Sequence, residues 1–245
     1  MKEERYKLDK GMLIDLFFDY IHLLMLHYGL WFRETEHQLG LDKAIEADGM
    51  VWKQFLPIFM GRVAERLEIP MKGGTFEFLA NMSNERLVGL LEDTGKNWVA
   101  GDGVWFQTVE RNYDYEMYTA KRINDTNWVK FSYIEAKTIM KRLNLPQNGG
   151  ISALKEAMKY RLYALINKQE IIDAGDNKII FRMNDCRVQS ARKRKGLPDY
   201  PCKSAGIAEY SRFAEAIDPR IKTKCIGCPP DPHPEEWWCA WEFEI

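Results

Sequence analysis

The chain has 245 residues, enough for one large domain or two small ones with an ample core. Its hydrophobic content of 46% and charged content of 29% are those of an ordinary globular protein, and its formal net charge of −1 provides no overall attraction to nucleic acid or to an anionic membrane. Twelve Phe, eleven Tyr and eight Trp indicate a thick aromatic core or a pocket walled by aromatic rings.

The N-terminal region lacks the pattern of a signal peptide, because residues 1–5 are acidic as well as basic and no small-residue cleavage site follows. The apolar run over residues 12–32 is the membrane candidate of the sequence. Asp15 and Asp19 interrupt it, and each would cost roughly 2.5–3.5 kcal/mol at the centre of a bilayer. We therefore expect a buried helix here, in a cytoplasmic protein without membrane contact.

An internal repeat comes next, with residues 29–102 recurring as residues 103–176 at an offset of 74 to 76. In each copy we expect a long helix that ends before a Pro, then a Gly-Gly turn and a second helix. Such a repeat predicts a duplicated helical unit whose two copies pack with pseudo-twofold symmetry. The matched positions include Trp31, Glu36, Ala44, Trp52, Pro70 and Gly73-Gly74 in the first copy and Trp105, Glu110, Ala120, Trp128, Pro146 and Gly149-Gly150 in the second.

The pattern changes after residue 175. Alternating apolar residues predict a strand over residues 179–186, a basic loop spans residues 192–196, and a helix is expected over residues 204–217. Residues 221–225 and 237–245 then predict a hairpin. The expected fold is α+β: a mainly helical region, residues 1–175, covers a small antiparallel sheet in a Cys-rich region, residues 176–245, and the two form one compact unit.

All five cysteines lie in that last region. Without an export signal, clustered thiols are more often metal ligands or reactive groups than disulfides. Cys225-x2-Cys228 can hold one tetrahedral ion, and we expect Cys186 and Cys202 to complete the site. His233 and Cys239 are the alternative ligands. Zinc is the favoured metal, an iron–sulfur cluster is the alternative, and buried unmetallated thiols are the third reading.

Other side chains suggest a ligand site. Arg187, with the basic run at residues 192–195, can bind a phosphate or a carboxylate, although such runs are usually solvated. Glu36 and Glu110, equivalent in the two repeats, can form a carboxylate pair or simply bridge helices. Trp31 and Trp105 are candidates for the wall of an aromatic pocket. Nucleic-acid binding ranks last, because the near-neutral charge lacks the phosphate attraction that dominates such affinity.

The C-terminal sixty residues resemble a known group of sequences. The residues that carry the resemblance are Cys186-Arg187, the Gly196-Leu197-Pro198 and Tyr200-Pro201-Cys202 turn, Phe213, Cys225 and Trp238-Cys239 with Phe243. They resemble proteins similar to L-2-amino-thiazoline-4-carboxylic acid hydrolase and the 4-vinyl-reductase-type small-molecule-binding domains. The whole chain looks like an uncharacterised family of prokaryotic cytosolic proteins related to these. The resemblance implies a closing hairpin and binding of a small molecule.

The sequence therefore predicts a cytoplasmic, metal-stabilised protein that binds a small molecule in a binding or sensor role. A hydrolase acting on a small C–N or C–S heterocycle, as the resemblance implies, is one alternative. An iron–sulfur redox protein is the other. A homodimer is left open.

Overall fold

The computed structural model describes residues 6–113 and 117–245. These residues form an α+β fold of helices and antiparallel sheets, which confirms the predicted class. The chain divides into two compact units, Met1–Met82 and Ser83–Ile245. The region boundary predicted near residue 175 falls at the turn between two neighbouring strands of the second unit.

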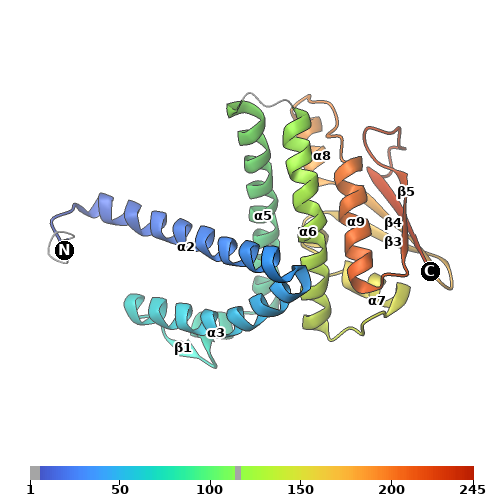
Figure 1. Cartoon of the computed structure of the whole chain (residues 1–245). Coiled ribbons are helices and arrows are strands. Elements are labelled where there is room, and N and C mark those ends of the chain that lie inside the picture. Colours follow the sequence, from blue (N-terminus) through green and yellow to red (C-terminus); the bar gives the residue numbers. More distant parts are fainter. Residues whose placement is uncertain (1–5, 114–116) are drawn as a thin grey trace. The chain divides into compact units, whose positions relative to one another are not determined.

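The first unit is built on two long helices, α2 (Lys10–Leu39) and α3 (Leu41–Leu67) (Figure 1). Asp9 caps α2 by accepting a hydrogen bond from the Met12 amide at 3.0 Å. Gly40, with φ of 86°, separates the two helices, a conformation that favours glycine. Between them, the Tyr28 hydroxyl donates to Asp48 Oδ1 at 2.8 Å, and α3 continues through Pro57.

A small hairpin follows α3. Strands β1 (Met71–Lys72) and β2 (Thr75–Phe76) pair antiparallel around Gly73-Gly74. Both glycines have positive φ, as a two-residue hairpin turn of this twist requires. The one-turn helix α4 (Glu77–Ala80) completes the unit.

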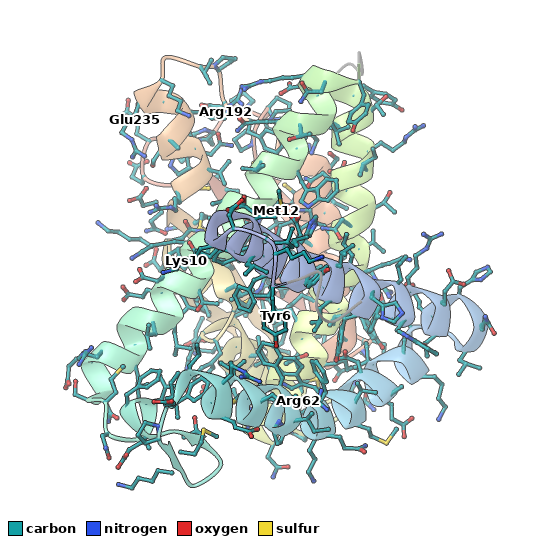
Figure 2. All side chains as sticks on the ribbon, turned by 90° about the vertical axis from the view of Figure 1, so that its left-hand side faces the viewer. Tyr6, Lys10, Met12, Arg62, Arg192 and Glu235 are labelled. Carbon is teal, nitrogen blue, oxygen red and sulfur yellow. The ribbon has the colours of Figure 1, made fainter. Side chains whose placement is uncertain are left out.

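Helix α2 is not the buried helix that the sequence predicts: none of its residues is buried. Its apolar side chains lie around the helix rather than on a single stripe, and Figure 2 shows them projecting from the ribbon that begins near Lys10 and Met12. In length and composition α2 could also cross a membrane, and no other helix of the described residues could. The prediction failed because apolar character alone does not show that the chain supplies a covering partner.

The second unit begins with two further long helices, α5 (Asn84–Asn112) and α6 (Met117–Leu143). The Ser83 hydroxyl caps α5. Helix α7 (Gly150–Met158) and the 3-10 helix η1 (Leu162–Leu165) lead from α6 to the sheet.

Four antiparallel strands form that sheet in the order β3-β4-β6-β5. Their bounds are β3 (Lys168–Gly175), β4 (Lys178–Asp185), β5 (Lys222–Gly227) and β6 (Cys239–Glu244). Strands β4, β5 and β6 lie close to where alternation in the sequence predicts them, whereas β3 is an additional strand. Two helices complete the unit: α8 (Arg187–Arg194) and α9 (Lys203–Ile217). The predicted basic loop is wrong in part, because Arg192–Arg194 form the last turn of α8, where cations are favourable.

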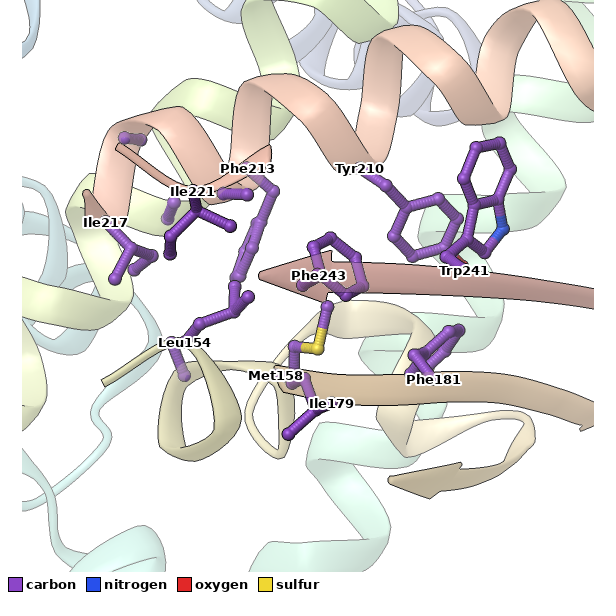
Figure 3. Packing of buried hydrophobic residues seen from close by; sticks show 14 of the residues in the cluster. Leu154, Met158, Ile179, Phe181, Tyr210, Phe213, Ile217, Ile221, Trp241 and Phe243 are labelled. Carbon is purple, nitrogen blue, oxygen red and sulfur yellow. The ribbon is translucent and has the colours of Figure 1, made fainter. Parts of the chain in front are cut away.

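The core of this unit lies between α9 and the sheet. In Figure 1, α6 and α9 run side by side and α9 lies next to the strands. Apolar side chains alternate along β4 and β6, so Phe181 lies opposite Trp241 in the register and both are 1% exposed. Figure 3 shows Tyr210 and Phe213 of α9 packed against this face.

The two repeat copies share one architecture over part of their length. In each, a long helix carrying Trp31 or Trp105 precedes a second long helix carrying Trp52 or Trp128. The copies then diverge: Gly73-Gly74 turns a hairpin, whereas Gly149-Gly150 begins α7. Whether the two copies are related by a pseudo-twofold axis stays a prediction.

Candidate functional site: a buried cysteine cluster

The five cysteines come from four different elements of the second unit. Cys186 follows β4 and is the N-cap of α8, and Cys202 is the N-cap of α9. Cys225 lies in β5 opposite Trp241, Cys228 comes directly after β5, and Cys239 begins β6 opposite Met183.

The topology explains why these positions meet. Because β4 and β5 both run antiparallel to β6, the ends of β4 and β5 lie beside the start of β6. A backbone hydrogen bond from Lys203 to the Pro229 carbonyl, 2.9 Å long, joins the start of α9 to the segment after β5. The Lys203 ammonium also pairs with Asp231 at 2.7 Å. One end of the sheet thus gathers all the thiols of the chain.

Within the cluster, Cys228 and Cys239 are neighbours. The Cys239 side chain, followed by burial, raises the pKa of Cys228 strongly. The charges that Cys202 and Cys225 would carry as thiolates raise it further. All five cysteines are free thiols, and Cys228 is 1% exposed.

Cys186, Cys202 and Cys225 are also held in their neutral form. Burial raises the pKa of Cys186 to about 12, although the backbone amides of Gln189 and Val188 act in the opposite direction. Burial, then the neighbouring Cys186 and Cys239, raise the pKa of Cys202. Burial also raises the pKa of Cys225, against the opposing charge of Lys203. A bound cation is the kind of group that would reverse this preference.

Gln189 contacts both Tyr200 and Cys202 at the edge of the cluster. Its amide nitrogen donates to the Tyr200 carbonyl at 2.8 Å and lies 3.1 Å from Cys202 Sγ, while its oxygen accepts from the Tyr200 amide at 2.9 Å. The side chain is 1% exposed. Gln189 therefore positions Cys202 and ties α8 to the segment before α9.

A buried ionic network lies near the cysteine cluster. Arg161 Nε donates to Glu135 Oε2 at 2.9 Å, and Arg161 Nη2 is 2.7 Å from Glu209 Oε1, an ion pair whose orientation does not give a hydrogen bond. Burial raises the pKa of Glu209 to about 7, more than the Arg161 charge lowers it. Glu209 in turn raises the pKa of Cys186 and Cys202, so the network and the thiols form one electrostatic unit.

The other predicted site residues lie on several different elements. Glu36 and Trp31 lie on α2 in the first unit, and Glu110 and Trp105 lie on α5 in the second, so the proposed carboxylate pair stays a prediction. Arg187 is exposed at the start of α8, where its amide donates to Asn167 Oδ1 at 2.8 Å.

His233 has its own surroundings. Its ring packs on Trp237 and Trp238, its Nδ1 is 2.8 Å from the Pro234 carbonyl, and its Nε2 is 3.7 Å from Asp199. These contacts place it in the proline-rich loop, with the ring held by aromatic side chains.

Two hollows lie on the helical side of the second unit. One, of about 580 Å³, is formed by α6 and the start of α9, and its lining includes Lys121, Asp125 and Ser204. The other, of about 260 Å³, lies between α5 and α6 and is lined by Asp102, Trp105, Phe106, Val109, Ala120, Ile123, Asn124 and Asn127. Trp105 is thus the one predicted ligand-site residue that borders either hollow.

Sequence reasoning missed Gln189, Glu209, Arg161 and Asp102. Glu209 had a visible signal: it lies four residues before Phe213 and therefore on the apolar stripe of α9, where a charge is unusual. The contribution of Gln189 depends on a loop conformation that no local pattern encodes.

Among the residues that the structure describes, no three His, Cys, Asp or Glu side chains already lie in positions that would hold a metal ion. The cluster is therefore a gathering of neighbouring thiols, in which Cys239 influences Cys228 most strongly.

The model of a family of unknown function (DUF6125) matches residues 6–81 and 80–245 of the chain. The junction of the two matched segments coincides with the division between the two compact units. No curated protein and no solved structure matches the chain.

Proposed function

The chain belongs to this family of unknown function, DUF6125, and from its own geometry we propose that the second unit carries a thiolate metal centre, with zinc as the metal. The observation that carries the proposal is that four separate elements bring every cysteine of the chain to one end of one sheet. Small buried thiols are common singly, but five gathered in one place are the donor set of a soft metal.

The contacts favour a particular set of four ligands. Cys228 interacts electrostatically with Cys239, Cys202 and Cys225, and these mutual interactions favour the four as ligands. Cys186 interacts electrostatically with Cys202 and Cys239 and is the alternative fourth ligand. This set differs from the sequence-based one by replacing Cys186 with Cys239.

Metal binding requires two changes in this cluster. The sulfur atoms must draw together, since no three are yet in ligating positions within the described part of the chain. The raised pKa values also mean that the metal must displace protons, so its affinity should rise with pH. A closed site of four thiolates leaves no position for water, and the centre would be structural. It would tie α9 to the β5–β6 hairpin, in a cytoplasmic protein with a binding or sensor role.

Cobalt substitution tests the proposal directly. Anaerobic protein, freed of metal and titrated with Co²⁺, should develop thiolate-to-cobalt absorption at one equivalent, and Zn²⁺ should abolish it. Cys228→Ser and Cys239→Ser should each weaken Co²⁺ binding at least tenfold. Cys186→Ser is the matched control that leaves the four preferred ligands in place. Equal effects of all three substitutions, or no cobalt absorption at all, would contradict the proposed ligand set.

A second candidate, an enzyme, is supported by a different observation. Glu209 has a pKa near 7 and interacts electrostatically with Cys186 and Cys202, which is the combination of a base and a nucleophile that acyl or C–N bond hydrolysis uses. The resemblance to hydrolases of small C–N or C–S heterocycles agrees with this. Iodoacetamide alkylation that proceeds fastest at Cys186 or Cys202, and slows in Glu209→Gln, would favour the enzyme. An iron–sulfur centre, the third candidate, would show visible absorbance and iron in protein purified without added metal.

We also propose that the partner of the first unit is a second copy of the chain. Thirteen large apolar side chains of α2 are exposed: Met12, Leu13, Ile14, Phe17, Phe18, Tyr20, Leu23, Leu24, Met25, Leu26, Leu30, Trp31 and Leu39. If about half of them entered one contact, they would bury on the order of 600 Å² per partner, since a buried aromatic ring covers 150–250 Å². A standard interface needs roughly 800 Å² per partner, which exposed residues of α3 such as Trp52 and Phe59 can complete. Asp15 and Asp19 disfavour a bilayer as the alternative partner.

A further inference from the structure

The hollow between α5 and α6 is lined by one face of each helix. Asp102, Trp105, Phe106 and Val109 recur at the spacing of one helical face on α5, and Ala120, Ile123, Asn124 and Asn127 do the same on α6. We call this hollow of about 260 Å³ the Asp102 cleft. Its size suits a small molecule rather than a peptide.

Asp102 places a charged carboxylate in a partly buried cleft. Within the residues that the structure describes, its carboxylate forms no salt bridge and no hydrogen bond, and it is half-buried. Burial alone raises its pKa. A carboxylate that loses water without gaining a partner is destabilising, so its presence here calls for a cation from outside the chain.

The walls of the cleft select the type of cation. Trp105 and Phe106 offer aromatic faces, which attract a cation through the ring quadrupole, and Trp105 is 71% exposed and thus accessible. Asn124 and Asn127 supply neutral amides, with the Asn124 nitrogen 3.4 Å from the Tyr200 hydroxyl. No strongly ligating set of oxygens surrounds a single point among these lining residues, as a bare metal ion would need.

The neighbouring cation is already neutralised. Lys121 lies next to Ala120 on α6, but its ammonium pairs with Asp125 at 2.9 Å and lies 5.0 Å from the centre of the Tyr200 ring. The charge of Asp102 is therefore left for a ligand.

We propose that the Asp102 cleft binds a small organic cation, an amine or ammonium compound with an apolar group, whose charge pairs with Asp102 and packs against Trp105 and Phe106. This assignment names a ligand class for the small-molecule role in the proposed function and does not depend on the metal.

The cleft is linked to the cysteine cluster by a short series of contacts. The Phe106 and Tyr200 rings are 5.2 Å apart at their centres, and Tyr200 is held through its backbone by Gln189, which contacts Cys202. A ligand that displaces Phe106 would therefore shift Tyr200 and, through Gln189, the position of Cys202.

Benzylamine and its neutral counterpart benzyl alcohol are suitable probes, with binding measured by titration calorimetry and by tryptophan fluorescence. We expect benzylamine to bind at least tenfold more tightly than benzyl alcohol. Asp102→Asn should remove that preference. Asp93→Asn, on the same helix but exposed and paired with Lys96, is the matched control and should leave it unchanged.

Trp105→Ala provides a second test, because this exposed residue can be replaced without disturbing the core. It should weaken benzylamine binding several-fold. Equal affinity for the two probes, no binding of benzylamine, or an unchanged preference in Asp102→Asn would overturn the assignment. The zinc content should be the same in wild type and in Asp102→Asn, so failure here and failure of the metal proposal are distinguishable.

Discussion

Cys228 and Cys239 are electrostatic neighbours at the end of the sheet where β5 ends and β6 begins. These two residues are eleven positions apart in the sequence, across a proline-rich loop. The loop between β5 and β6 therefore turns back so that the two thiols lie close together. The same loop is bonded to the start of α9 through Lys203 and Pro229, which brings Cys202 into the group.

The packing beneath the cluster gives a first prediction. A Cβ atom added at Gly206 would lie 2.5 Å from Cζ2 of Trp241, so Gly206→Ala forces either α9 or the indole to move. We expect a loss of about 1–3 kcal/mol in the free energy of unfolding, measured by urea denaturation.

Gly89→Ala is the control for this substitution. Gly89 lies within α5 and nothing approaches its added Cβ within 4 Å, so alanine should stabilise by roughly 0.5–1 kcal/mol through helix propensity. If both variants had the same stability, the close approach of α9 to Trp241 would be wrong.

The ionic network gives a prediction about pH. The pKa of Glu209 is raised to about 7 in the folded protein from 4.5, so the folded state retains a proton that the unfolded state has lost between these values. The stabilisation is complete below pH 4.5 and is lost as the pH rises to about 7. The free energy of unfolding should therefore fall over this window, by at most about 3 kcal/mol.

Glu209→Gln should flatten the pH dependence of unfolding between pH 4.5 and 7. Cys186, Cys202, Cys225 and Cys228 do not interfere, since their raised pKa values affect stability only above about pH 9. A variant with the same slope as wild type would show that Glu209 is ionised over the whole window.

Asp218 provides a prediction about the far end of α9. Its fully buried carboxylate accepts from the Gly150 amide at 3.0 Å and from Arg220 Nε at 2.9 Å, and the hydrogen bonds of Arg220 lower its pKa to about 2. Asp218→Asn should cost about 2 kcal/mol of unfolding free energy at neutral pH. This contribution is present above pH 3.8 and is lost as the pH falls through 2.

Asp173→Asn serves for comparison, because Asp173 pairs with Lys155 at 2.6 Å but is 71% exposed. Its loss should cost less than about 1 kcal/mol. Similar destabilisation by both substitutions in urea would contradict the anchoring of α7 by Asp218.

The exposed surface of α2 predicts self-association. Light scattering after size-exclusion chromatography should give the mass of a dimer, and the triple variant Phe17→Ser/Phe18→Ser/Met25→Ser should give a monomer that remains helical. Ile207→Ser, an exposed apolar position on α9, should leave the dimer intact. A monomeric wild type, or wild type that floats with liposomes and requires detergent, would contradict a second copy as the partner.

The strands and helix of the cysteine-rich region were predictable because short-range signals mark them. Alternation places Phe181 and Met183 on one face of β4, and the apolar stripe that includes Phe213 marks α9. Helices α3 and α6 were predictable from the Pro that follows each, whereas the segments around Trp31 and Trp105 gave no clear choice between strand and helix. These features depend only on neighbours within a few residues.

It was harder to predict which residues are buried and which residues lie close to one another. The sequence of α2 reads as apolar, yet what covers it depends on surfaces far away in the chain or outside it. The proximity of Cys239 to Cys228 depends on how the proline-rich loop turns, which the Cys-x2-Cys spacing does not encode. Asp102 shows the same limit, because α5 gives no sign in sequence that this face borders a hollow.

The most direct measurement of the central proposal is the metal content of anaerobically purified protein by plasma mass spectrometry, compared with Cys228→Ser/Cys239→Ser. The proposal predicts one equivalent of zinc per chain in wild type, little in the double variant, and a lower midpoint of thermal unfolding when the zinc is lost. Wild type that contains no zinc, gains none on reconstitution with Zn²⁺ and unfolds at the same temperature as the double variant would contradict a thiolate metal centre.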